Sequence, residues 1–206
     1  MKKQTRQRAL LSEEAARIMI EEGVSDCALA KSKAANRLNI HHKTNLPDDE
    51  EVEAACALRL ALFHPNAENI EQAKLNIAEE GMTMLGDFSP RLAGHLIHGP
   101  ILKNTVIQIH VFADSLEEVY LLLDNEDISA ELVEEVFYYK RGEPVNIPTL
   151  RLDIDSHPIA INVFPHRDIR KKPLSSGRQK TMERWSIDQL RTRRAVGQEL
   201  ECENQE

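Results

Sequence analysis

The chain has 206 residues, 41% of them hydrophobic, and a formal net charge of −8. This length and composition are enough to bury a core, and we expect one domain with appendages. The sequence has no run of 18 apolar residues, which excludes a conventional membrane-spanning helix. The basic start of the chain is not followed by the apolar core of a signal peptide, so we expect a cytoplasmic protein.

The charge is distributed unevenly along the chain. Residues 166–198 contain ten Lys and Arg against three Asp and Glu, a net charge of about +7 that leaves about −15 for the rest. Such a split is typical of an interaction tail, or of a basic segment that folds back on an acidic body.

The first 85 residues predict helices joined by short connections. Apolar residues recur at helical spacing, and the acidic residues that follow Asp48 suit the positive end of a helix dipole. We expect four helices: Leu11–Glu22, a second starting after Ser25 or Asp26 and ending at Leu38, Asp48–Phe63, and Ala67–Leu85.

The middle of the chain predicts a pair of strands. The apolar runs Leu92–Ile97 and Val106–Phe112 have strand length and flank a turn that contains Gly99 and Pro100. Ser115 and Glu118 then fit a capping box that would start a helix ending near Asp124.

Three more strands are expected after this helix. Their predicted ranges are Ser129–Lys140, Ile147–Ile154 and Pro158–Phe164, and the last two are joined by a hairpin loop at Asp155-Ser156-His157. The order predicts an α+β or α/β fold, in which a mixed sheet with flanking helices follows a helical N-terminal region. We expect a helical region over residues 1–86, an α/β domain over 87–165, and a basic, partly disordered extension over 166–206.

The residues His98-Gly99-Pro100, a short linker and the strand 106–111 form a strand–turn–strand unit. Together with the order of elements over residues 86–165, this unit resembles the nucleotidyltransferase fold, typified by DNA polymerase beta. In that family a strand ending in Gly-Ser holds a nucleotide phosphate, and two Asp alternating with apolar residues on the next strand hold Mg²⁺ for phosphoryl transfer. Here Val106 and Gln108 stand in the Asp positions. The resemblance therefore implies a degenerate, bacterial-type member that lacks the metal-binding carboxylates.

Strand alternation places Val106, Gln108 and His110 on one face of the predicted sheet. The neutral side chains of Val106 and Gln108 cannot hold Mg²⁺ against its hydration. His110, with His98 nearby, could orient a phosphate or act as a general base, or the two histidines could simply bond to the backbone. We predict no catalytic or metal-binding residue, and a candidate ligand cleft formed by Gly99, Gln108, His110 and Asp153.

Three functions follow from these patterns. The leading one is a catalytically degenerate nucleotidyltransferase-like protein without a cofactor, which binds a small ligand such as a nucleotide, or a protein partner. In the second, Asp153 or Asp155 holds Mg²⁺ from a relocated position and nucleotidyl transfer is retained. In the third, the basic segment binds nucleic acid through its phosphates. The side chains named for this third function are Arg170, Lys171, Lys172, Arg191, Arg193 and Arg194.

Overall fold

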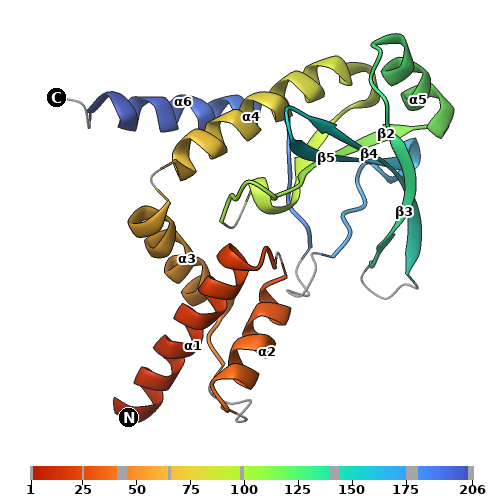
Figure 1. Ribbon diagram of the computed structural model, residues 1–206. Helices are drawn as coiled ribbons and strands as arrows, with labels where there is room; N and C mark the ends of the chain where they lie inside the picture. Colours follow the sequence, from red (N-terminus) through yellow and green to blue (C-terminus); the bar gives the residue numbers. More distant parts are fainter. Residues whose placement is uncertain are drawn as a thin grey trace. The chain divides into compact units, whose positions relative to one another are not determined.

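In the computed structural model the chain forms two compact units (Figure 1). The structure describes residues 2–24, 26–40, 46–64, 66–97, 100–139, 144–174 and 181–203. The described residues up to Ile70 and residues 100–105 form one unit, which we call the helical unit. The other described residues form the second unit, which we call the sheet unit.

The helical unit contains α1 (Lys2–Glu21), α2 (Cys27–Arg37) and α3 (Asp49–Phe63). Two of these helices begin at an aspartate that caps the first turn. The Asp26 carboxylate accepts a hydrogen bond of 2.9 Å from the Leu29 backbone N–H. Asp48 accepts one of 2.8 Å from the Glu51 N–H, and the Glu51 carboxylate accepts one of 2.9 Å from the Asp48 N–H. These bonds satisfy N–H groups that the first turn of a helix leaves without partners.

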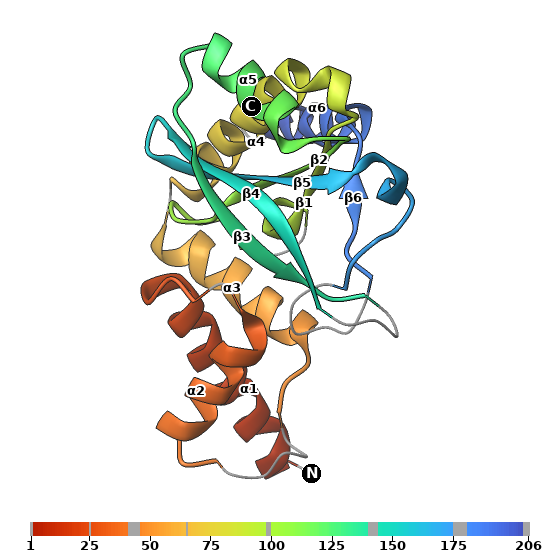
Figure 2. The ribbon, with the colours of Figure 1, turned by 90° about the vertical axis from the view of Figure 1, so that its right-hand side faces the viewer.

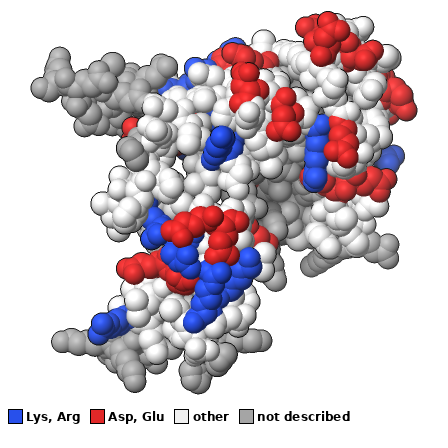
Figure 3. Space-filling model, viewed as in Figure 1, with Lys and Arg blue, Asp and Glu red and all other residues white. Residues whose placement is uncertain are grey.

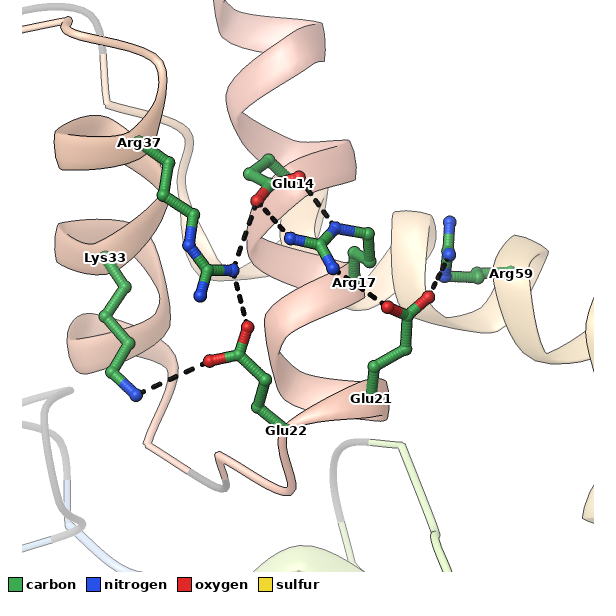
Figure 4. Close-up of polar contacts among 7 residues, drawn as sticks. All are labelled: Glu14, Arg17, Glu21, Glu22, Lys33, Arg37 and Arg59. Carbon is green, nitrogen blue, oxygen red and sulfur yellow. Dashed lines mark hydrogen bonds and ion pairs between the residues drawn. The ribbon is translucent and has the colours of Figure 1, made fainter.

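Small and medium apolar side chains form the core of the helical unit. Its fully or nearly fully buried members are Leu11, Ala15, Ala16, Ile18, Met19, Ala30, Ala34, Val52 and Cys56. Around this core, glutamates of α1 and Glu22, which directly follows it, form ion pairs with basic residues of all three helices (Figure 4). Glu22 contacts the Arg37 guanidinium of α2 at 2.5 Å, and Glu21 pairs with Arg59 of α3. Surface ion pairs of this kind each contribute about 1 kcal/mol or less, so burial of the core is the main source of stability.

The sheet unit is built on six strands and three helices. The strands are β1 (Arg91–Ala93), β2 (Ile107–Ala113), β3 (Glu131–Phe137), β4 (Val145–Ile154), β5 (His157–Pro165) and β6 (Arg184–Trp185). The helices are α4 (Ala67–Met84), within which the boundary between the units falls, α5 (Leu116–Asn125) and α6 (Ile187–Glu203).

The strands form one mixed sheet in the order β3-β4-β5-β2-β1-β6. Only β2 and β5 are parallel, and the other neighbours are antiparallel. The β4–β5 hairpin turns at Asp155 and Ser156, which both have positive φ, as a tight two-residue turn requires.

Helices α4, α5 and α6 lie on one face of the sheet (Figures 1 and 2). Gly81 of α4 allows a close approach there, because a Cβ atom at this position would lie 3.2 Å from Ile109 Cδ1. Side chains that alternate with Ile109 along β2 point to the opposite face, which has its own cluster of buried apolar residues. That cluster contains Phe112, Phe137, Ile147 and Phe164.

The structure confirms the predicted fold class, with N-terminal helices followed by a mixed sheet and flanking helices. Several element boundaries differ from those predicted. α1 begins at Lys2 rather than Leu11. The Arg8 guanidinium in its polar first turns contacts Asp48, which caps α3, and Glu51 of α3. The predicted capping box is wrong, because the Ser115 side chain makes no capping hydrogen bond.

The first predicted strand is also shorter than expected. β1 ends at Ala93, because Gly94 has φ of +77° and turns the chain into a short 3₁₀ turn over Gly94–Leu96. The C-terminal segment, for which a basic, partly disordered extension was predicted, contributes β6 and α6. None of the helices formed by the described residues is long and apolar enough to cross a membrane.

Candidate functional site

The centre of the sheet places Gln108 and His110 on the face opposite α4, which we call the polar face. In the parallel pairing with β5, Gln108 lies beside Ala160 and His110 beside Asn162. On the far side of β5, Asn162 pairs with Thr149 of β4. The predicted alternation of β2 therefore brings two polar side chains of β2 next to polar side chains of the neighbouring strands.

These polar side chains form a connected hydrogen-bond network. Gln108 Nε2 donates to Asn162 Oδ1 at 2.9 Å. Asn162 Nδ2 donates to Thr149 Oγ1 at 2.7 Å and to Glu135 Oε2 at 3.0 Å. Arg151 Nη2 donates at 2.8 Å to the other Glu135 oxygen, so the carboxylate is paired with a cation. We call this set of five residues the amide network.

The buried side chains of the amide network form hydrogen bonds with other members of the network. Asn162 and Thr149 are fully buried. Both N–H groups of the Asn162 amide have acceptors, and its oxygen has a donor, so this side chain has no free N–H to offer a ligand. Glu135 supplies the network's only carboxylate, and it is already neutralised by Arg151. The network therefore does not fit a divalent cation, which needs several oxygen ligands and usually carboxylates.

Gly94 completes this part of the site, because its backbone lies against the Gln108 side chain. A Cβ atom at residue 94 would come within 2.7 Å of Gln108 Oε1, so a larger residue would displace the amide. Gly94 directly follows β1, whereas Gly99, the glycine predicted to line the cleft, lies outside the described residues together with His98. The amide of Gln108 thus fills the space between the glycine that ends β1 and the middle of β5.

His110, one step further along β2, is bonded to an arginine rather than to a ligand or to the backbone. Arg184 Nε of β6 donates to His110 Nδ1 at 2.9 Å, and Arg184 Nη1 donates to the Lys171 carbonyl at 3.0 Å. The guanidinium carbon lies 5.0 Å from the Phe112 ring centre and 4.7 Å from that of Phe164. These distances fit cation–π contacts, which stabilise a buried guanidinium.

This environment keeps His110 neutral. Burial, and then the positive charge of Arg184, lower the pKa of His110 well below its ordinary value. Because Nδ1 accepts from Arg184, the ring proton resides on Nε2, which is buried and has no hydrogen-bond partner among the described residues. Neither nitrogen has an exposed lone pair, so the ring in this arrangement cannot take a proton from a substrate.

Burial also acts on the arginine itself. It lowers the pKa of Arg184 to about 10, which leaves the side chain charged at neutral pH. Within the described part of the chain no carboxylate forms an ion pair with it, so the aromatic rings and the carbonyl of Lys171 provide its contacts.

The remaining candidate acids lie away from Gln108. Asp153 is exposed and pairs with Pro158 of β5, and Asp155 is exposed in the hairpin turn. Asp153 and Gln108 are two strands apart, which is about 10 Å at ordinary strand spacing. Val106 precedes β2 and is 44% exposed. The structure therefore brings Gln108 and His110 together and leaves Asp153 apart from them.

The basic C-terminal segment folds back on acidic residues of the sheet unit. Arg191 and Arg194 of α6 both contact the Glu79 carboxylate of α4, the former at 2.7 Å. Arg193 pairs with Glu71 at 2.9 Å and donates to the Ile97 carbonyl at 3.2 Å. Closer to β5, Lys171 pairs with Asp168 at 2.6 Å, while Arg170 and Lys172 are exposed.

Sequence patterns did not predict Gly94, Asn162 or Arg184, nor the other amide-network residues Thr149, Glu135 and Arg151. A glycine directly after three residues of strand, at Ala93-Gly94, is a local signal for the end of β1. An asparagine within the apolar run of β5 is a signal for a buried amide that needs partners. No local signal marks Arg184, which lies 74 residues from His110 in the sequence.

No group of three or more His, Cys, Asp and Glu side chains in the described ranges is arranged to hold a metal ion. Comparison of the chain with protein-family models, curated proteins and solved structures gives no match.

Proposed function

We propose that this chain is a nucleotidyltransferase-like protein with a degenerate centre, which acts by binding a ligand or a partner rather than by catalysing transfer. The hydrogen bond between Gln108 and Asn162 carries the proposal. In the family that the chain resembles, two Asp on the strand of Gln108 hold Mg²⁺. Here Gln108 stands at one of those positions, and its neutral amide is bonded to that of Asn162.

The network supports the absence of a transfer step in two ways. Phosphoryl transfer in this family depends on metal ions that neutralise phosphate charge, and amide side chains that are bonded to each other offer few oxygen ligands. A general base is also missing from the centre, since Arg184 occupies the Nδ1 lone pair of His110.

Isothermal titration of the whole chain with ATP and with GTP, each with and without Mg²⁺, tests the proposal. We expect Mg²⁺ to leave any nucleotide affinity unchanged, and we expect no label transfer from a radiolabelled nucleotide. Metal-dependent binding accompanied by turnover would refute the degenerate centre.

The same assay distinguishes the relocated-carboxylate alternative. If transfer occurs and either Asp153→Asn or Asp155→Asn abolishes it, the exposed acids of the β4–β5 hairpin hold the metal. Asp124→Asn is the matched control, because this exposed acid lies on α5.

Nucleic-acid binding is the weaker alternative, because Arg191, Arg193 and Arg194 already pair with glutamates of α4. Binding through phosphates would weaken steeply with salt. Absent or salt-insensitive binding to RNA and DNA would reject it.

A further inference from the structure

β3 is one of the two edge strands of the sheet, and it is longer than the other, β6. β3 is the first strand in the sheet order and pairs with β4 on one side only. Among the described residues no strand pairs with its other side. An edge strand of this kind offers a row of N–H and C=O groups to an incoming chain.

The side chains of β3 alternate cleanly between a covered and an open face. Val133, Glu135 and Phe137 point to the polar face and are at least partly buried. On the other face Leu132, Val136 and Tyr138 are 55%, 52% and 55% exposed. On this face Glu134 lies between Leu132 and Val136, and Tyr138 directly follows the strand. Exposed apolar side chains of this size on and beside an edge strand are unusual for a surface that contacts only water.

The surroundings of this strand are strongly acidic. Residues 114–139 contain nine Asp and Glu and no Lys or Arg. Within the described part of the chain, Glu135 is the only one of the nine that forms an ion pair. Figure 3 shows acidic side chains over α5 and beside β3, on the right of the view. The acids on β3 itself that have no cationic partner are Glu131 and Glu134.

We propose that the edge of β3 is a docking site for an extended segment of another protein that contains both Lys or Arg and apolar residues. The segment would add an antiparallel strand beside β3. Its apolar residues would cover Leu132, Val136 and Tyr138, and its cations would lie opposite Glu131 and Glu134. Opposite charges on neighbouring strands attract, which selects basic segments over acidic ones. This inference names a partner for the binding role in the proposed function and rests on it to that extent, but the edge is separate from the amide network.

Charge argues against a second copy of this chain as the partner. Antiparallel pairing of all seven residues of β3 with the same strand of another copy would place Glu134 opposite Glu134. Like charges directly opposite each other destabilise a strand pair.

A designed peptide tests the inference on the full chain. The probe is a capped seven-residue peptide of threonine, valine and lysine, with valine opposite Leu132 and Val136 and lysine opposite the three glutamates of β3. We expect saturable binding with a Kd below about 1 mM, together with slower hydrogen exchange at the backbone amides of β3. A peptide with glutamate in place of lysine should not bind.

A charge-reversal pair gives the matched control on the protein side. Glu131→Lys combined with Glu134→Lys should raise the Kd of the lysine peptide about tenfold. Each attractive cross-strand charge pair changes the affinity a few-fold, and charge reversal makes the pair repulsive. Glu117→Lys with Glu118→Lys makes the same change on α5 and should alter binding less than about twofold.

Three results would overturn the proposal: no binding at about 1 mM peptide, equal effects of the two charge reversals, or exchange protection that falls elsewhere in the chain. Dimerisation of the wild-type chain through β3 in sedimentation equilibrium would also overturn it, in favour of a second copy. If the β3 variant fails to fold, the lysine and glutamate peptides on the wild-type chain still decide the question. Loss of peptide binding would leave the nucleotide titrations untouched, so the two proposals fail separately.

Discussion

The centre of the sheet and its β3 edge both carry polar groups, but they use them differently. At the centre, Gln108, Asn162 and Thr149 bond to one another inside the protein. At the edge, Glu131 and Glu134 have no cation, and the outer main-chain groups of β3 have no neighbouring strand among the described residues. Polar groups that are satisfied internally contribute to folding and specificity, whereas groups left open are available for recognition. The centre therefore serves stability, and the edge is where we propose that a partner binds.

The largest effect is expected from removing the arginine at the centre. Arg184→Ala leaves the His110 Nδ1 acceptor without its donor and opens space against two phenylalanine rings. We expect the free energy of unfolding, measured by urea denaturation, to fall by about 3 kcal/mol. Arg191→Ala is the control, since its side chain is 53% exposed and its ion pair with Glu79 should contribute less than about 1 kcal/mol. Equal losses for the two variants would contradict the description of the centre.

A second variant tests the amide network. Asn162→Leu removes the partner of Gln108 and leaves the buried Thr149 hydroxyl short of a bond, which should lower the free energy of unfolding by about 1–3 kcal/mol. Adding Gln108→Leu should recover part of this loss, because the orphaned amide is removed as well. Additive losses in the double variant would mean that the two side chains do not act as a pair.

The centre should also make the protein sensitive to acid. The pKa of His110 is lowered by burial and by Arg184, so the unfolded chain binds a proton first as the pH falls below about 6.5. The contribution of His110 to the free energy of unfolding should therefore be constant above that pH. Below it, this contribution should decline by at most about 1.4 kcal/mol per pH unit. His110→Phe should flatten this part of the pH profile. His64→Gln changes an exposed histidine and should leave the profile as it is.

The smallest effect is expected at the edge. Glu134→Gln alters an exposed side chain whose only described contact is a hydrogen bond from Asn146, so the free energy of unfolding should change by less than about 0.5 kcal/mol. Thermal denaturation of Glu134→Gln and Asn162→Leu side by side compares the edge with the centre, and the loss of stability should be larger for Asn162→Leu. A large loss at Glu134 would mean that the edge, like the centre, serves stability.

Local sequence signals predicted those parts of the fold that local physics determines. The acidic residues that follow Asp48 predicted the start of α3, and Asp155-Ser156-His157 predicted the hairpin between β4 and β5. Alternation along β2 correctly placed Gln108 and His110 on one face, because the side-chain period of a strand is two wherever the strand lies.

The site itself depends on contacts that no local pattern contains. Gln108 meets Asn162 across 54 residues of sequence, and His110 meets Arg184 across 74. The end of β1 was misplaced for a related reason. The apolar run Leu92–Ile97 favours a strand, and the glycine within it, which has positive φ in the structure, is the one local sign that the strand ends early.

Electron paramagnetic resonance of Mn²⁺ tests the central claim most directly, because Mn²⁺ substitutes for Mg²⁺ in oxygen-ligand sites. With ATP present, the account predicts that adding the protein leaves the distribution between free and ATP-bound Mn²⁺ unchanged. A single bound Mn²⁺ with a Kd well below about 1 mM, lost in Gln108→Leu, would contradict it by showing that the amide network opens to hold a metal.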